Sequence, residues 1–148
     1  MAAMVRLDTR PDGAAALARA RAHLDTLGWY PRPVRMRRVR MYLAPWFFRL
    51  PLVRRFHGYA AWNLILLREL PFTDGLVAHE LCHVWQMQHH PLRMPLTYLH
   101  TPYRTNPWEV QARRARRGCA PDAARRPGQR VTRLRPCRAV PTAFVAFA

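Results

Sequence analysis

Leu76-Val-Ala-His-Glu-Leu-Cys-His-Val-Trp-Gln86 is the stretch around which the rest of the chain is organised. Its apolar residues recur at helical spacing, which predicts an α-helix with an apolar face in the core. Thr73 or Asp74 can cap the N-terminus of this helix, because a short polar side chain there accepts a hydrogen bond from a free backbone N–H group. Pro91 ends the helix, since proline cannot donate to the helical ladder.

Two histidines and a glutamate interrupt the apolar pattern of this helix. His79 and His83 are four residues apart, so they lie one turn above each other on one helix face and point two imidazoles at one place. Glu80 follows His79 directly and can reach a water molecule at that place. Two imidazole ligands, a carboxylate base and an open coordination position form the arrangement of zinc hydrolases. The sequence therefore predicts a site for Zn²⁺ in preference to Mn²⁺ or Co²⁺.

A zinc site needs a third protein ligand, and two candidates follow the helix. His89 lies six residues after His83, but that pattern needs a glycine at position 86 to turn the chain, and Gln86 is a good helix former. Glu109 lies about 26 residues beyond His83, far enough for a loop to fold it back over the first helix. Glu109 is the better candidate. With Asn106 as N-cap of a second helix, however, Glu109 also stands where a capping box places its acid.

Two segments together carry a family resemblance. His-Glu-Leu-Cys-His-Val-Trp-Gln at 79–86, followed by Asn-Pro-Trp-Glu-Val-Gln-Ala at 106–112, resembles the gluzincin group of zinc metallopeptidases, in particular its small bacterial members. The resemblance covers roughly residues 57–117. It implies an α+β, zincin-like fold, in which a small mixed or antiparallel sheet packs on the HExxH helix and on a second, ligand-bearing helix.

The same resemblance implies roles for individual residues. His79, His83 and Glu109 correspond to the zinc ligands of the gluzincins, and Glu80 corresponds to their general base. The chain departs from the group at Arg113, where larger relatives keep a carboxylate that orients a zinc-bound histidine.

Length and composition set the domain organisation. A chain of 148 residues suffices for one domain with a modest core. Its 25 basic residues are all arginine, against 8 acidic residues, for a net charge of +17. With the abundant alanine and proline, this resembles the codon bias of a GC-rich genome, so the basic excess is weak evidence for a partner. Residues 1–117 are predicted to form a single zincin-like domain and 118–148 a loosely ordered basic tail, whose apolar end at 139–148 can dock on the body.

No targeting segment or membrane span is predicted. Residues 1–13 are charged and lack the apolar core of a signal peptide, and no run approaches the ~18 apolar residues that a span needs. Cys82, Cys119 and Cys137 are odd in number and form no C-x-x-C pair, which predicts reduced thiols. We expect a cytoplasmic monomer without a membrane partner.

Further elements are expected before the metal helix. Residues 12–27 are predicted to form a first helix, which Asp12 can cap and Gly28 can end. Residues 34–43 alternate arginine with apolar side chains, as in a strand with one solvated basic face. Residues 59–67 are an apolar run, which predicts one buried strand.

The segment that connects the two predicted ligand-bearing helices is expected to line the substrate cleft. The segment 87–105 is expected to be a loop over the metal. His100 and Tyr103, both in this loop, are our candidates for the donor that stabilises the oxyanion of a tetrahedral intermediate. By resemblance to zincins, the strand at 59–67 forms a sheet edge that pairs with the substrate backbone. An interior strand without a free edge fits the run about as well.

Other functions compete with a peptidase acting on a peptide or protein. The arginine-rich strand, with Trp29 and Tyr42 nearby, fits a basic nucleic-acid-binding module, for which we expect weak and non-specific binding. His-Glu-Leu-Cys-His also resembles DNA-associated proteases of the SprT type, in which a later histidine is the third ligand, and His100 is the candidate here. The last alternative is an inactive zinc-binding scaffold.

Overall fold

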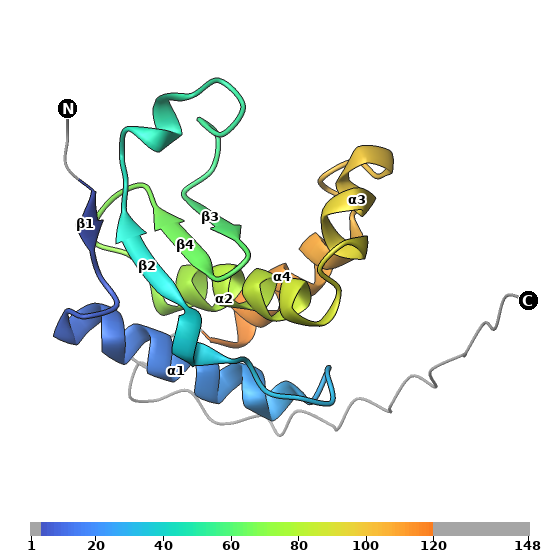
Figure 1. Cartoon of the computed structure of the whole chain (residues 1–148), viewed down its shortest axis with the longest axis horizontal. Coiled ribbons are helices and arrows are strands. Elements are labelled where there is room, and N and C mark those ends of the chain that lie inside the picture. Colours follow the sequence, from blue (N-terminus) through green and yellow to red (C-terminus); the bar gives the residue numbers. More distant parts are fainter. Residues whose placement is uncertain (1–3, 120–148) are drawn as a thin grey trace, which may run out of the picture.

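The computed structural model describes residues 4–119. These residues form an α+β fold in which a small mixed sheet lies against helices (Figure 1), as the sequence predicts. The strands are β1 (Val5–Arg6), β2 (Arg40–Leu43), β3 (Gly58–Ala61) and β4 (Leu64–Leu67). The α-helices are α1 (Pro11–Leu27), α2 (Asp74–His89), α3 (Arg93–His100) and α4 (Pro107–Gly118).

The sheet has the strand order β1-β2-β4-β3. Its two central strands, β2 and β4, are parallel, and each outer strand is antiparallel to its neighbour. Ile65 and Leu67 are fully buried on one face of β4, and Leu66 is buried on the other face. β3 lies at the end of the strand order, next to β4. β3 is therefore an edge strand, and it packs beside α2.

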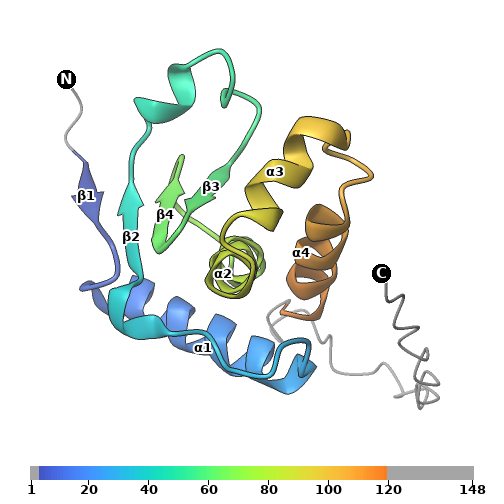
Figure 2. The same ribbon diagram turned by 45° about the vertical axis from the view of Figure 1, so that its right-hand side comes forward.

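Helix α2 occupies the centre of the molecule. Viewed nearly along its axis in Figure 2, it is surrounded by the sheet, α1 and α4. Every residue from Val77 to Met87 is buried, and a helix that is apolar nearly all round is stable only in such a position. Buried among these apolar residues, the two histidines and the glutamate of the motif need polar partners.

Helix ends follow the predicted chemistry in most cases. The Thr73 side chain accepts a hydrogen bond from the Leu76 amide at 3.2 Å and caps α2. Gly28 ends α1 with a left-handed φ of 59°, a conformation that glycine adopts at little cost. Asp12 does not cap α1, which begins one residue earlier, at Pro11, after Arg10.

Two predicted strands differ from the structure. Of residues 34–43, only the last four form β2, and Met36–Arg38 form a 3-10 turn instead. Residues 59–67 are not one strand but the hairpin β3–β4, which reverses at Trp62 with a left-handed φ of 55°. A two-residue hairpin turn requires such a conformation. The hairpin gives the sheet its free edge.

The segment 87–105 is not a single loop. Helix α2 continues to His89, and the short helix α3 follows. The next helix, α4, begins as predicted: the Asn106 side chain accepts a hydrogen bond from the Trp108 amide at 3.0 Å, with Pro107 at the first helical position. α3 stands across from the free edge of β3, and together they border the space above α2 (Figure 2).

Two further predictions concern the C-terminal tail and membrane-spanning helices. The loosely ordered tail and its apolar end fall almost wholly outside the described residues. Within residues 4–119, none of the helices combines the length and apolar character of a membrane-crossing segment.

Candidate metal centre

Two helices bring three ligand side chains together. His79 and His83 project from adjacent turns of α2, and Glu109 projects from the first turn of α4, which packs against α2. One ligand atom of each residue lies within 4.8 Å of the other two, and all three residues are buried. This His-His-Glu group is positioned to hold a metal ion, and its members are those that the sequence predicts.

Distances within the group fit a tetrahedral ion. Nε2 of His79 lies 3.2 Å from Nε2 of His83 and 3.5 Å from Oε2 of Glu109. Nε2 of His83 lies 3.3 Å from Oε1 of Glu109. Two ligand atoms that each lie ~2.0–2.1 Å from a tetrahedral Zn²⁺ are separated by roughly 3.3–3.4 Å. The separations within the group are therefore close to those between the ligands of one such ion, with a different oxygen of Glu109 nearest each histidine.

Gln86 fixes the orientation of His83. The Nε2 atom of Gln86 donates to the Trp108 carbonyl at 3.0 Å and to Oε1 of Gln111 at 2.8 Å. Both partners are acceptors, so the amide oxygen of Gln86 must face His83, where it accepts from Nδ1 at 2.8 Å. The Tyr30 hydroxyl completes the network by donating to Oε1 of Gln111 at 2.7 Å. Because Nδ1 carries the proton, Nε2 of His83 can offer its lone pair to a cation.

Electrostatics in the group favour a bound cation. Oε2 of Glu109 is buried without a hydrogen-bond partner among the described residues. Burial and the charge of His83 lower the pKa of His79 to about 4. Burial also lowers the pKa of His83, but its hydrogen bond to Glu109 and the neighbouring carboxylates outweigh burial and leave this pKa raised. A bound cation would accept the Nε2 lone pairs of both histidines and offset the charge of the Glu109 carboxylate.

The carboxylate of Glu109 is held by more than the histidines. The Tyr98 hydroxyl donates to Oε1 of Glu109 at 2.9 Å. Burial opposes ionisation of Glu109, but hydrogen bonds from His83 and Tyr98 and the histidine charges hold its pKa below the usual value. The capping-box alternative fails geometrically, because the Asn106 amide donates to the Pro102 carbonyl and Glu109 faces the histidines.

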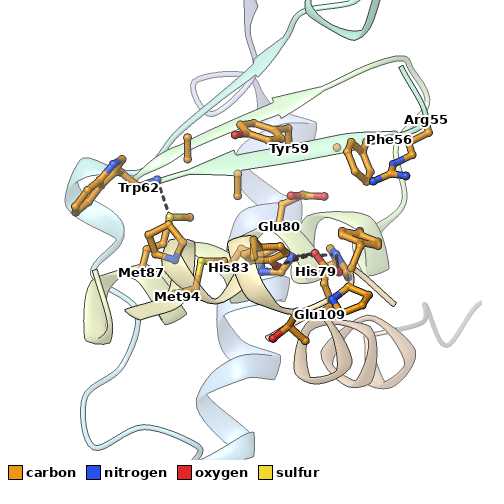
Figure 3. A pocket seen from close by; sticks show the side chains of 18 residues that line it. Arg55, Phe56, Tyr59, Trp62, His79, Glu80, His83, Met87, Met94 and Glu109 are labelled. Carbon is orange, nitrogen blue, oxygen red and sulfur yellow. Dashed lines mark hydrogen bonds and ion pairs between the residues drawn. The ribbon is translucent and has the colours of Figure 1, made fainter. Parts of the chain in front are cut away.

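Glu80 lies beside the group on the wall of a cavity of about 590 Å³. Figure 3 shows its carboxylate between β3 and the two histidines. Burial raises the pKa of Glu80 to about 7, so a proton is held and released there near neutral pH. A Cβ atom on Gly58 would lie 2.5 Å from Oε1 of Glu80. The absence of a side chain on β3 at this point leaves room for the carboxylate.

Only one of the two candidate oxyanion donors lies at the cavity. Tyr103 lines the cavity, and burial together with the charge of Glu109 raises its pKa, so the phenol keeps its proton. His100 is exposed at the end of α3 and does not line the cavity. The structure therefore does not support His100 as an oxyanion donor or as a third ligand of the SprT kind. His89, which the sequence analysis rejected as a ligand, hydrogen-bonds the Trp85 carbonyl through Nδ1, away from the group.

Several residues of the site were missed from the sequence. Gln86 counted only as a helix former, yet the spacing of three residues from His83 places it within reach of that ring. Tyr98 belongs to the segment that was expected to line the cleft, but its contact with Glu109 was not predicted. Neither that contact nor the role of Gln111 could be predicted locally, because both depend on how α3 and α4 pack on α2.

No protein-family model matches the chain, and searches of curated proteins and of solved structures found no match either. Assignment of this site consequently rests on its geometry: a buried His79-His83-Glu109 group that could bind a metal ion, with a carboxyl group and a cavity beside it.

Proposed function

We propose that the protein is a zinc-dependent hydrolase that cleaves peptide bonds. The observation that carries the proposal is the separation of 3.2–3.5 Å among the ligand atoms of His79, His83 and Glu109. Two imidazoles and one carboxylate are a donor set of catalytic zinc, which keeps a fourth position open for water or substrate. Glu80 beside the open cavity supplies the base that such a site needs.

Zn²⁺ held by this group would polarise a substrate carbonyl and lower the pKa of a water molecule. The protein residues handle the proton: Glu80 accepts it from the attacking water and delivers it to the leaving amine. Burial raises its pKa above the usual value, which suits it to both steps. Tyr103, protonated and facing the same cavity, donates a hydrogen bond to the carbonyl oxygen as negative charge develops there.

The free edge of β3 supports a peptide substrate. The Arg68 amide donates a hydrogen bond to the His57 carbonyl at 3.0 Å, at the open end of the hairpin. Every second residue of β3 therefore hydrogen-bonds β4, and the residues between them direct their backbone groups away from β4. By this alternation, Gly58 and Ala60 direct their backbone groups to the free edge. Both residues line the cavity. An extended peptide can add to this edge with its carbonyl groups near the His-His-Glu group.

The substitution Glu80→Gln tests the proposal. An amide cannot accept the proton of the attacking water, so we expect hydrolysis of a mixed peptide library to fall by about 10²–10⁴-fold, with zinc content and a cooperative folded structure retained. Cleavage products are identified by mass spectrometry. Zinc-loaded wild-type protein that cleaves no peptide, or a variant that matches the wild type, would remove hydrolysis from the account and leave a metal-binding scaffold.

A further inference from the structure

The cavity has two chemically different ends. Trp62, Met87 and Met94 lie at one end, whereas Arg55 and Phe56 lie at the other, with Glu80 and the His-His-Glu group between them (Figure 3). The first end offers thioethers and an indole, which favour an apolar side chain. The second end offers a guanidinium group.

Two aromatic rings from opposite walls hold the Arg55 guanidinium in place. Its Cζ atom lies 5.0 Å from the ring centroid of Phe56 and 5.6 Å from that of Tyr103. The two ring centroids are themselves 5.2 Å apart. Phe56 precedes β3, and Tyr103 lies between α3 and α4, so the cation sits where the two walls meet. Cation–π attraction reduces the motion that a surface arginine would otherwise have.

Arg55 lacks a carboxylate partner among residues 4–119, where the observed arginine–carboxylate ion pairs involve other arginines. The two acids of the cavity are engaged elsewhere, since Glu109 faces the histidines and Tyr98, and Glu80 lies against Gly58. A divalent cation would offset the charges of both glutamates. With the cation bound, the charge of Arg55 is not compensated within the cavity. The resulting excess positive charge favours an anionic ligand.

We propose that Arg55 binds a carboxylate of the substrate. The substrate class is a peptide with an apolar side chain on one side of the scissile bond and a carboxylate on the other. That carboxylate comes from the C-terminus of the peptide or from an Asp or Glu side chain. The inference rests on the proposed function and adds the substrate class to it.

Geometry of strand addition suits this class. A peptide that runs along the free edge of β3 passes from the Trp62 end to the Arg55 end, because β3 follows Arg55 and Trp62 follows β3. Groups a few residues apart on such a peptide meet the two ends at the same time. The planar guanidinium of Arg55 presents paired N–H donors that match the two oxygens of a carboxylate.

Binding of short peptides tests the inference without any need for turnover. Full-length protein with Glu80→Gln, which leaves peptides intact, is titrated with and without added ZnSO₄. Two probes are acetyl-Leu-Ala-Ala with a free C-terminal carboxylate and the same peptide with a C-terminal amide. The other two are acetyl-Leu-Ala-Asp-amide, which places the carboxylate on a side chain, and acetyl-Asp-Ala-Leu-amide, which covers the opposite chain direction. Methyl NMR signals of Met87 and Met94 report binding up to ~10 mM peptide.

At least one carboxylate peptide should bind about tenfold more tightly than the neutral peptide, as a charge-assisted hydrogen bond provides. Arg55→Gln should abolish this preference and leave the neutral peptide unaffected. Arg54→Gln is the matched control, because it removes the same charge from an exposed neighbour that does not line the cavity. The C-terminal and side-chain probes identify the source of the carboxylate.

Equal affinities for all four peptides, a preference that survives Arg55→Gln, or no binding of any peptide would overturn the inference. The proposed function fails in a different way. If zinc does not bind and a carboxylate preference that depends on Arg55 is nevertheless present, the zinc hydrolase is contradicted and the carboxylate site stands.

Discussion

The amide oxygen of Gln86 lies 2.8 Å from Nδ1 of His83, and both residues are buried. The other end of the same amide donates to α4, at the Trp108 carbonyl and at Gln111. One side chain thus joins the two helices that carry the candidate ligands and also sets the tautomer of one ligand.

Gln86→Leu should weaken zinc binding by about 10–100-fold, because His83 loses the acceptor that orients its ring. Gln88→Leu is the matched control: Gln88 lies on the same helix and bonds Arg35 and Asn63, away from the ligands. Competition with a chromophoric chelator measures both affinities. Equal losses in the two variants would make Gln86 a structural residue only.

Glu109→Gln should weaken zinc binding strongly while leaving the helix content of the metal-free protein nearly unchanged. Asn106 caps α4 with its own side chain, so the cap does not need the Glu109 carboxylate. Two neutral imidazoles, by contrast, need an anionic partner to hold a dication. Circular dichroism and metal titration separate the two effects. A variant that binds zinc like the wild type would return Glu109 to a purely structural role.

Gly58→Ala should destabilise the protein by about 1–3 kcal/mol through overpacking, since the added Cβ atom meets Oε1 of Glu80 at 2.5 Å and its Cδ at 2.8 Å. In a Glu80→Ala background the same change should cost little, because the colliding side chain is gone. Urea unfolding of the four proteins gives the coupling energy. Additive effects would show that Gly58 and Glu80 are independent.

Stability of the metal-free protein should depend on pH through Glu80. Burial raises the folded-state pKa of Glu80 from 4.5 to about 7, so above pH 4.5 the unfolded state releases this proton first. The contribution of Glu80 to stability is therefore lost as pH rises from 4.5 to 7, by roughly 3 kcal/mol at most. The lowered pKa of His79 acts in the opposite direction over the same range, so the comparison with a Glu80 variant isolates the Glu80 contribution. Glu80→Gln should remove this loss, so the free energy of unfolding of the variant should increase relative to that of the wild type as pH rises. A difference that is constant with pH would contradict the raised pKa.

Local chemistry made much of this fold predictable. The i, i+4 histidines, the Thr73 and Asn106 caps and the terminating Gly28 each act through neighbours in the sequence. Glu109 was also identifiable, since glutamates are rare in the chain and this one opens a helix.

Features that depend on packing between distant elements were not predictable. The hairpin turns at Trp62 rather than at a glycine, so its apolar run resembles one strand. Helix α3 was not predicted because three leucines on and next to it are exposed, so its apolar residues do not mark a buried face. The bond between Gln86 and Gln111 exists only because α4 lies along α2, a placement that no local pattern specifies.

Metal analysis of the purified protein tests the central claim most directly. Zinc per chain is measured by mass spectrometry on wild-type protein prepared without chelators and on the His79→Ala/His83→Ala variant. The account predicts one zinc per wild-type chain and none in the variant, because two of the three ligands are lost. Wild-type protein without zinc, or zinc that persists in the variant, would contradict the site.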